Sequence, residues 1–308
     1  MSSFLDYLTL GIVLGSMYAI FAIGYTLVYG VLQLINFAHS EVFMTGGFVG
    51  MIVLTEFAPS RPHGFPSVLW MVIGCLSGMV GGAAIAWCLE RVAYRPLRKA
   101  HAPRLVFLLS AVGASFFLYN LCGKLFGRTP IQVPSLYTNS VLFHWPGTSV
   151  EVRVNQVVVV GAAVVMMIAL DRVVNRTKLG SGIRAVAQDA ETAGLMGVDI
   201  DRVVSRTFVI GGLLGGAAGF LYGYAVSGQV VFTMGFVPGI KAFAAAVLGG
   251  IGNVRGAMLG GLLLGVIESF TVPLLGSEWI DVAAFVILVL VLMFRPTGLL
   301  GERLGRSA

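Results

Sequence analysis

The stretch Val-Val-Val-Val-Gly-Ala-Ala-Val-Val-Met-Met-Ile-Ala-Leu at residues 157–170 decides the fold class of this chain. It holds no charged residue, and residues 282–294 repeat the same continuous apolar character. The strands of a membrane β-barrel would instead alternate polar and apolar residues in segments of about ten. These runs therefore predict helices that cross a membrane, and the fold class is all-α.

Composition supports a protein that lies largely in lipid. Of 308 residues, 57% are hydrophobic and only 11% are charged, and the mean hydropathy is +0.91. A water-soluble domain would have a charged fraction near a quarter. The composition excludes a soluble globule, and we expect one polytopic transmembrane domain over residues 1–308.

Apolar windows near twenty residues long recur along the chain and predict about eight spans. Their ranges are 8–29, 37–55, 67–89, 105–123, 155–173, 207–227, 240–275 and 279–295. The seventh is too long for one straight span, so we expect a re-entrant half-helix followed by a return helix. For the first pair two arrangements stay open: a cytoplasmic turn near residues 30–36, or a helix broken in mid-membrane. Residues 1–7 carry no Lys or Arg, so we expect the first span to be retained.

Basic residues cluster in three segments, which the positive-inside rule assigns to the cytoplasm. They are Arg91, Arg95, Arg98, Lys99 and Arg104; Arg172, Arg176, Lys178, Arg184, Arg202 and Arg206; and Arg295, Arg303 and Arg306. The second segment forms a loop at about 175–206 and the third a tail at about 296–308. The only basic residues of segments 56–66 and 124–153 are Arg61, Lys124, Arg128 and Arg153. We expect these two segments on the outer side.

Small residues predict close helix packing. The chain has 41 glycines, nearly twice the usual share. Several recur four residues apart: Gly74, Gly78 and Gly82; Gly211, Gly215 and Gly219; Gly252, Gly256 and Gly260. Such stripes let helix backbones approach one another in a membrane. Hinges, or a pathway lined by backbone, are the alternative interpretation.

The sequence offers little for catalysis. Gly250–Gly256 approaches a dinucleotide fingerprint, but its last spacing is one residue too long and no strand precedes it. No phosphate-binding P-loop occurs, and the histidines and cysteines lack metal-site spacing. We expect no catalytic residue, metal, cofactor or nucleic-acid partner, so any ATP hydrolysis would belong to another subunit. Asn253 and Arg255 instead mark the turn of the re-entrant element.

Polar residues within the spans are candidates for a pathway or gate, because each is costly in lipid. Asn36, His39 and Glu41 fit either such a role or a solvated turn in which Asn36 caps the following helix. Lys241 fits an interfacial snorkelling residue or a binding group. Glu268 could be satisfied by pairing with Lys241 or Arg255.

The charged segment between Arg172 and Arg206 separates two apolar spans. A helix is predicted there, entered through Gly180-Ser181-Gly182 and ending within residues 194–197. Its apolar face comprises Ile183, Val186, Ala187, Ala190 and Ala193 or Gly194, and its polar face Arg184, Gln188 and Glu191. The helix could rest on the membrane surface. Its small apolar face better suits docking against another protein.

Several segments resemble the first permease subunit of bacterial high-affinity branched-chain amino-acid importers of the ATP-binding-cassette class. They are Gly-Ser-Met-Tyr-Ala (15–19), Gly-Tyr-Thr-Leu-Val-Tyr-Gly (24–30), Ile-Asn-Phe-Ala-His-Ser-Glu (35–41), Glu-Arg-Val-Ala-Tyr-Arg-Pro-Leu-Arg (90–98), Lys-Ala-Phe (241–243) with Leu-Gly-Gly-Ile-Gly (248–252), and Arg-Pro-Thr-Gly-Leu-Leu-Gly (295–301). The resemblance runs in order from about Gly11 to Gly301. One departure is Ser40, where the family usually has glycine.

The resemblance implies a heterodimeric pore in the bacterial inner membrane with a cytoplasmic C-terminus. A sister permease, two cytoplasmic ATPases that bind the ATP, and a periplasmic amino-acid-binding protein would be the partners. The family's coupling helix would fall on Gly182, Ile183, Arg184, Ala185, Gln188, Asp189, Ala193 and Gly197. Because the family also includes permeases for urea and short amides, these solutes are an alternative.

Two other classes use a similar bundle. A passive channel for small neutral solutes would need no docking helix. A secondary transporter would need an ion-coupling carboxylate, for which Glu268 is the candidate. We therefore expect an importer permease that works by alternating access.

Overall fold

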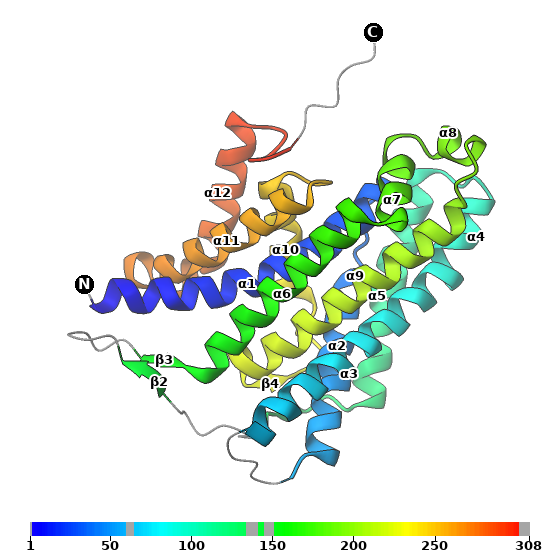
Figure 1. Ribbon diagram of the computed structural model, residues 1–308. Coiled ribbons are helices and arrows are strands. Elements are labelled where there is room, and N and C mark those ends of the chain that lie inside the picture. Colours follow the sequence, from blue (N-terminus) through cyan, green and yellow to red (C-terminus); the bar gives the residue numbers. More distant parts are fainter. Residues whose placement is uncertain (1, 60–64, 134–140, 145–150, 302–308) are drawn as a thin grey trace.

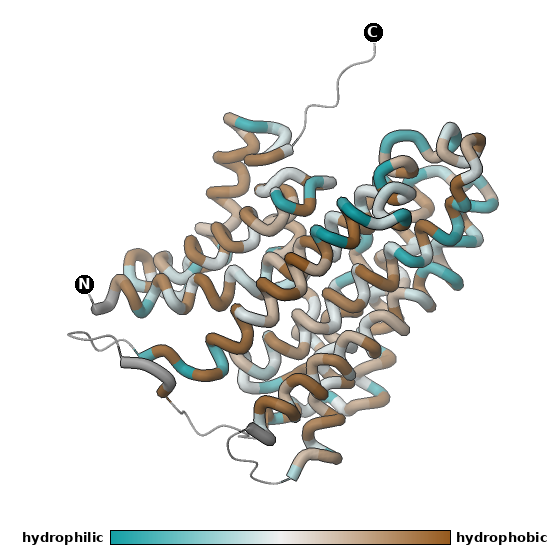
Figure 2. Tube along the Cα trace, in the orientation of Figure 1, coloured by the Kyte–Doolittle hydropathy of each residue, from teal (hydrophilic) through white to brown (hydrophobic). Residues whose placement is uncertain are grey.

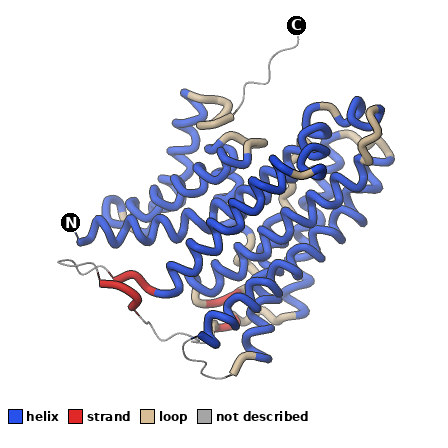
Figure 3. The backbone as a smooth tube through the Cα atoms, viewed as in Figure 1, coloured by secondary structure: helices blue, strands red, loops and turns tan. Residues whose placement is uncertain are grey.

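The computed structural model describes residues 2–59, 65–133, 141–144 and 151–301. This part of the chain is a helical bundle with two small pairs of strands (Figure 3). The predicted positions Arg61, Arg303 and Arg306, and most of the predicted tail at 296–308, lie outside the described residues.

Eight helical stretches of the described chain are long and apolar enough to cross a membrane. They are α1 (Ser2–Leu32); α2 (His39–Phe57); α3 (Phe65–Leu89) with the π-helical turn η1 (Glu90–Tyr94) and α4 (Arg95–Lys99); α5 (Arg104–Leu125); α6 (Val154–Arg176); α9 (Ile200–Tyr222) with the π-helical turn η2 (Gly223–Ser227); α11 (Val254–Leu275); and the 3-10 turn η3 (Ser277–Trp279) with α12 (Ile280–Phe294). This confirms the all-α polytopic fold.

The remaining elements are short. α7 (Lys178–Gln188) and α8 (Ala190–Leu195) follow α6, and α10 (Phe236–Gly249) precedes α11. β1 (Ile131–Gln132) pairs antiparallel with β4 (Gln229–Val230), and β2 (Val141–His144) pairs antiparallel with β3 (Glu151–Arg153).

The central helix of the bundle is α1, which is buried along most of its length, whereas almost none of α12 is fully buried. Close backbone contact explains how α1 packs. A Cβ atom added to Gly15 would lie 2.8 Å from the Cα of Leu262 on α11, a distance that real Cβ atoms do not show. The two helices therefore need glycine at this crossing.

The glycine stripes on α3 and α9 confirm the prediction of close packing. A Cβ atom on Gly82 of α3 would lie 2.8 Å from the Cα of Gly216 on α9. On α11, Gly256 and Gly260 approach the backbone of α10 in the same way. Gly252 meets no neighbour and instead has φ +95°, a conformation that glycine adopts readily in a turn.

The predicted basic segments gather at one end of the bundle. Arg95 and Arg98 bind Asp201 at 2.9 and 2.5 Å, which joins the first segment to the start of α9. At the same end, Arg255 binds Asp171 at 3.1 Å. α4, α7 and α8 lie together there, whereas β2, β3 and β4 lie at the opposite end (Figure 1). Hydrophilic residues concentrate around α4, α7 and α8 (Figure 2).

The seventh predicted region contains the expected half-helix and return helix, and the turn between them lies at the basic end of the bundle, where Arg255 pairs with Asp171. α10 has 14 residues and α11 has 22, and a turn at 250–253 separates them. α10 begins at Phe236, four residues before the predicted start at 240. Leu299 N donates to Leu248 O at 2.9 Å, so the segment after α12 closes over this turn.

The first two helices reverse direction near the basic end. Val28 and Val31 near the end of α1 share a buried cluster with Tyr94 and Ile183. The reversal agrees with a turn at that side, but it is not a solvated turn, because Asn36 is only 3% exposed. Within residues 33–38, Asn36 and Ala38 are buried, whereas Gln33 and Phe37 are exposed.

Candidate functional site

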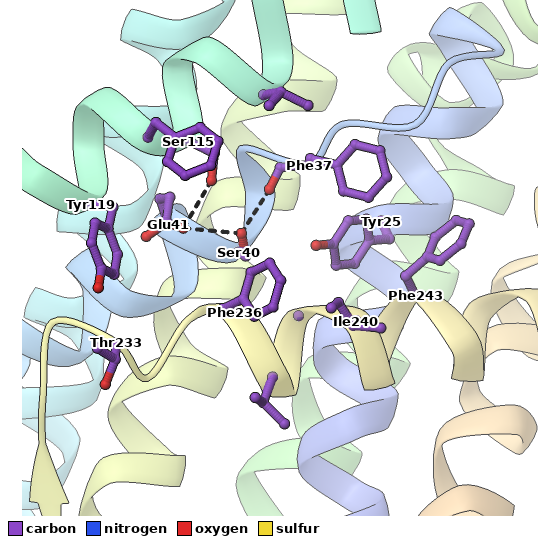
Figure 4. Close-up of a pocket in the computed structure, with 14 residues that line it drawn as sticks. Tyr25, Phe37, Ser40, Glu41, Ser115, Tyr119, Thr233, Phe236, Ile240 and Phe243 are labelled. Atoms are coloured by element: carbon purple, nitrogen blue, oxygen red, sulfur yellow. Dashed lines mark hydrogen bonds between the residues drawn. The ribbon is translucent and has the colours of Figure 1, made fainter. Parts of the chain in front are cut away.

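A cavity of about 730 Å³ lies between α1, α2, α5 and the first turns of α10 (Figure 4). Aromatic and aliphatic side chains make up most of its wall. Its lining residues are Tyr25, Phe37, Ser40, Glu41, Val112, Ser115, Phe116, Tyr119, Thr233, Phe236, Val237, Gly239, Ile240 and Phe243. A mostly apolar wall with a few convergent polar groups is typical of a small-molecule site.

Glu41 is the one ionisable carboxyl group in this wall, and it is only 2% exposed. Its Oε1 atom accepts a hydrogen bond from Ser115 Oγ at 3.0 Å (Figure 4). Ser40 Oγ lies 3.3 Å from the same atom, but its one hydroxyl proton has a closer acceptor, Phe37 O, at 2.7 Å. The Oε2 atom of Glu41 is buried without a hydrogen-bond partner among the described residues. No cation of the described chain forms an ion pair with it.

Asn36 and His39 lie beside this cavity but do not line it. Asn36 Oδ1 accepts a hydrogen bond from Tyr94 Oη at 2.7 Å. The capping prediction is wrong, since the residue before α2 is Ala38 and it makes no side-chain cap. The His39 ring packs 4.8 Å from the Tyr25 ring, and its Nε2 atom has no partner among the described residues.

Lys241 and Glu268 form a buried charge cluster on α10 and α11. Lys241 Nζ lies 3.0 Å from Glu268 Oε1 and 2.7 Å from Asp281 Oδ1. Tyr18 Oη donates to Glu268 Oε2 at 2.9 Å. Glu268 Oε1 makes no aligned hydrogen bond, so its contact with Lys241 is an ion pair by proximity.

The contacts in this cluster test two predictions about Lys241 and Glu268. Pairing of Glu268 with Lys241 is confirmed, whereas the snorkelling interpretation of Lys241 is wrong, because its side chain is buried between two carboxylates. Arg255 does not reach Glu268 and pairs with Asp171 instead. A carboxylate held by an internal cation is a poor candidate for ion coupling.

Asn253 organises the turn before α11. Its Oδ1 atom accepts hydrogen bonds from Arg255 N at 3.0 Å and from Gly256 N at 3.1 Å, and its Nδ2 donates to Leu300 O at 2.9 Å. Both Asn253 and Arg255 therefore lie at the basic end of the bundle and not at the cavity. Their contacts are those of a helix cap and a surface ion pair.

The predicted docking helix is divided into α7 and α8. Asp189 ends the first and caps the second, because its extended backbone lets Oδ1 accept from Glu191 N at 3.0 Å and Thr192 N at 3.1 Å. Hydrogen bonds from the Thr192 side chain and backbone hold the pKa of Asp189 below its usual value. The single helix of the prediction is therefore wrong in form.

Most of the predicted apolar face of these helices is already covered, although Ala190 is exposed. Ile183, Val186 and Ala193 are buried in one cluster with Val204 of α9, and Gly182 is buried as well. What faces outward is a polar surface with two large apolar side chains at its tip. We name the exposed residues from Arg184 onward the α7–α8 surface: Arg184, Gln188, Asp189, Ala190, Glu191, Thr192, Leu195, Met196 and Gly197. Ala185 is half-buried at its edge.

The family model described as "Branched-chain amino acid transport system / permease component" matches residues 7–293. The chain belongs to this family. It is 40% identical over 304 residues to the high-affinity branched-chain amino acid transport system permease protein LivH of Escherichia coli, covering 97% of this chain and 96% of the relative. It is also 40% identical over 300 residues to the permease protein BraD of Pseudomonas aeruginosa, with the same coverage.

A relative at lower identity is named for another solute. The fructose import permease protein FrcC of Rhizobium meliloti is 27% identical over 269 residues, which covers 80% of this chain and 69% of that relative. No solved structure matches the chain. The protein is thus a multi-pass membrane permease.

The sequence did not predict several residues of the cavity and of the α7–α8 surface. Tyr25, Ser115 and the aromatic ring of Phe243 come from three helices that meet only in the folded protein. Leu195 and Met196 could have been recognised from the sequence. They are two large apolar residues at the end of the predicted helix, outside its periodic apolar face.

Proposed function

We propose that this permease is one membrane subunit of an ATP-binding-cassette importer for branched-chain amino acids in a bacterial inner membrane. The observation that carries the proposal is 40% identity over nearly the full length of proteins named as high-affinity branched-chain amino acid permeases. A sister permease would complete a heterodimeric pore. Two cytoplasmic ATPases would bind the ATP, a periplasmic binding protein would deliver the solute, and the C-terminus would be cytoplasmic.

The α7–α8 surface supports a docking role for the predicted coupling segment. Leu195 and Met196 are 84% and 82% exposed at the basic end, where aqueous contact with such side chains is unfavourable. Arg184 donates to Ser181 Oγ at 3.4 Å and to Val174 O, which fixes the angle between α6 and α7. A partner that grips this tip would therefore move α6 and α9 together with it.

The transport mechanism that fits is alternating access. Closure of the ATPase pair would pull the α7–α8 surface, and the glycine-lined contacts of α1 with α9 and α11 would let the helices shift between two packings. The cavity beside Glu41 would form one wall of the pathway in this subunit. The second wall would come from the sister permease.

Reconstitution tests the proposal. Proteoliposomes holding this chain, a sister permease and the two ATPases should accumulate labelled leucine only with ATP and binding protein. Preference for urea or fructose would move the assignment to another branch of the family. Leucine flux through liposomes with this chain alone would favour a passive channel, and flux that follows a proton or sodium gradient would favour a secondary transporter.

The coupling role has its own variants. Leu195→Asp and Met196→Asp should abolish ATP-dependent uptake while the chain still inserts, since neither side chain packs inside the protein. Arg184→Glu and Gly197→Trp should do the same, the latter because Gly197 has φ +89°. Arg128→Glu, an exposed charge reversal at the other end, is the control. Normal uptake by the tip variants would exclude this surface from coupling.

A further inference from the structure

We propose that the cavity beside Glu41 binds the ammonium group of an aliphatic amino acid, with the Glu41 carboxylate as its counter-charge. The inference rests on the proposed function and deepens it, because it assigns a binding role to one carboxylate of this subunit. Nothing in the family relationship identifies a residue that touches the solute.

The buried charge of Glu41 favours a cationic ligand. A buried carboxylate is unfavourable unless a cation or several hydrogen bonds compensate it. Glu41 has two hydroxyl groups near Oε1 and no hydrogen-bond partner for Oε2 within the described chain. The described residues therefore leave the negative charge of Glu41, in the wall of the cavity, without a cation. A primary ammonium supplies three N–H donors and the missing positive charge.

The rest of the cavity wall suits an ammonium group with an alkyl tail. Tyr25, Phe116 and Phe243 place aromatic rings around the same space, and aromatic faces attract a desolvated ammonium group. Val112 and Ile240 offer aliphatic contact for an alkyl side chain. The cavity of about 730 Å³ has room for such a solute.

Other classes of ligand match the charge and the wall of this cavity less well. A lipid acyl chain would contact the apolar wall but leave the Glu41 carboxylate without a counter-charge. A divalent metal would need more ligands, and the described residues hold no cluster of three histidine, cysteine or acidic side chains. An anionic solute would be repelled by the carboxylate. An amine with an alkyl tail meets both the charge and the wall.

The test uses the full chain in nanodiscs and two fragments of leucine. The probe 3-methylbutylamine keeps the ammonium group and the branched tail, and 4-methylpentanoate keeps the tail and the carboxylate. Saturation-transfer NMR at pH 7 measures the binding of each. The amine should bind wild type, the acid should bind at least about tenfold more weakly, and Glu41→Gln should weaken amine binding by about tenfold or more. Glu56→Gln, an exposed carboxylate on the same helix, should change nothing.

Every outcome decides the proposal. Equal binding of amine and acid, or no amine binding, overturns it even if Glu41→Gln does not fold, because that comparison needs only wild type. Unchanged amine binding in folded Glu41→Gln also overturns it. The assay needs no ATPase or binding protein. A failure of leucine uptake in the reconstituted importer would therefore be distinct from a failure here.

Discussion

Two buried carboxylates of this permease are compensated in opposite ways. Glu268 is 4% exposed and lies against Lys241 and Tyr18, so the protein itself supplies a cation and a donor. Glu41 is 2% exposed, and within the described part of the chain its carboxylate has only the hydroxyls of Ser40 and Ser115 nearby as donors. The first group is neutralised within the fold, and the second faces a cavity.

The difference shows how a structural charge and a ligand-binding charge can be told apart inside a membrane protein. Lys241 ties the half-helix α10 to α11 and to Asp281 on α12, so its ion pairs hold the re-entrant element in place. Glu41 contacts another helix of the cavity wall only through the Ser115 hydroxyl among the described residues, and no ion pair holds it. Loss of the first charge cluster should therefore affect stability, and loss of Glu41 should affect solute handling.

The largest expected effect comes from Lys241→Met, which removes the internal cation. Because Glu268 would be left buried and unpaired, the free energy of unfolding should fall by about 3–5 kcal/mol. Denaturation of the purified chain in mixed micelles measures it. A wild-type transition would show that the ion pair does not support α10.

A double variant sharpens this result. Lys241→Met with Glu268→Gln removes both buried charges, while Asp281 is 60% exposed and can be solvated. The double variant should recover a large part of the stability lost in Lys241→Met, as broken buried pairs are worse than absent ones. The same micelle denaturation series checks it, and simple addition of two losses would contradict the pairing.

Glu41→Gln should leave stability nearly unchanged. The glutamine can still accept from Ser115, and no buried charge remains, so its free energy of unfolding should lie within about 1 kcal/mol of wild type or above it. A loss as large as that of Lys241→Met would place Glu41 in the structural class and remove the contrast.

The smallest effect is expected for Ser115→Ala, which removes one donor to Glu41. Amine binding should change by no more than about fivefold, equivalent to about 1 kcal/mol. Ser77→Ala on α3, whose hydroxyl donates to Gly74 O at 2.9 Å away from the cavity, is the matched control. Nuclear magnetic resonance titration of both variants compares them.

Much of the fold could be predicted because its signals are local. Apolar length fixed the helices, the excess length of 240–275 indicated the half-helix, and glycine spacing indicated which faces pack. The helix at 183–193 shows the limit of this reasoning. Its periodicity revealed an apolar face but not that α9 already covers it.

The candidate sites depended on distant residues. Glu41 and Ser115 are 74 positions apart, and Tyr18 and Glu268 are 250 apart, so no spacing along the chain predicts their contact. Asn36, His39 and Glu41 looked equivalent in sequence. Only the fold distinguishes them. Asn36 accepts a hydrogen bond from Tyr94, whereas Glu41 lines the cavity.

The most direct measurement is the number of leucine molecules accumulated per ATP hydrolysed by importers containing wild-type chain, Glu41→Gln or Glu56→Gln. For Glu41→Gln we predict binding-protein-stimulated ATP hydrolysis close to wild type and leucine uptake reduced at least about tenfold, with Glu56→Gln unaffected. An unchanged ratio in Glu41→Gln would contradict a solute-binding role for the cavity.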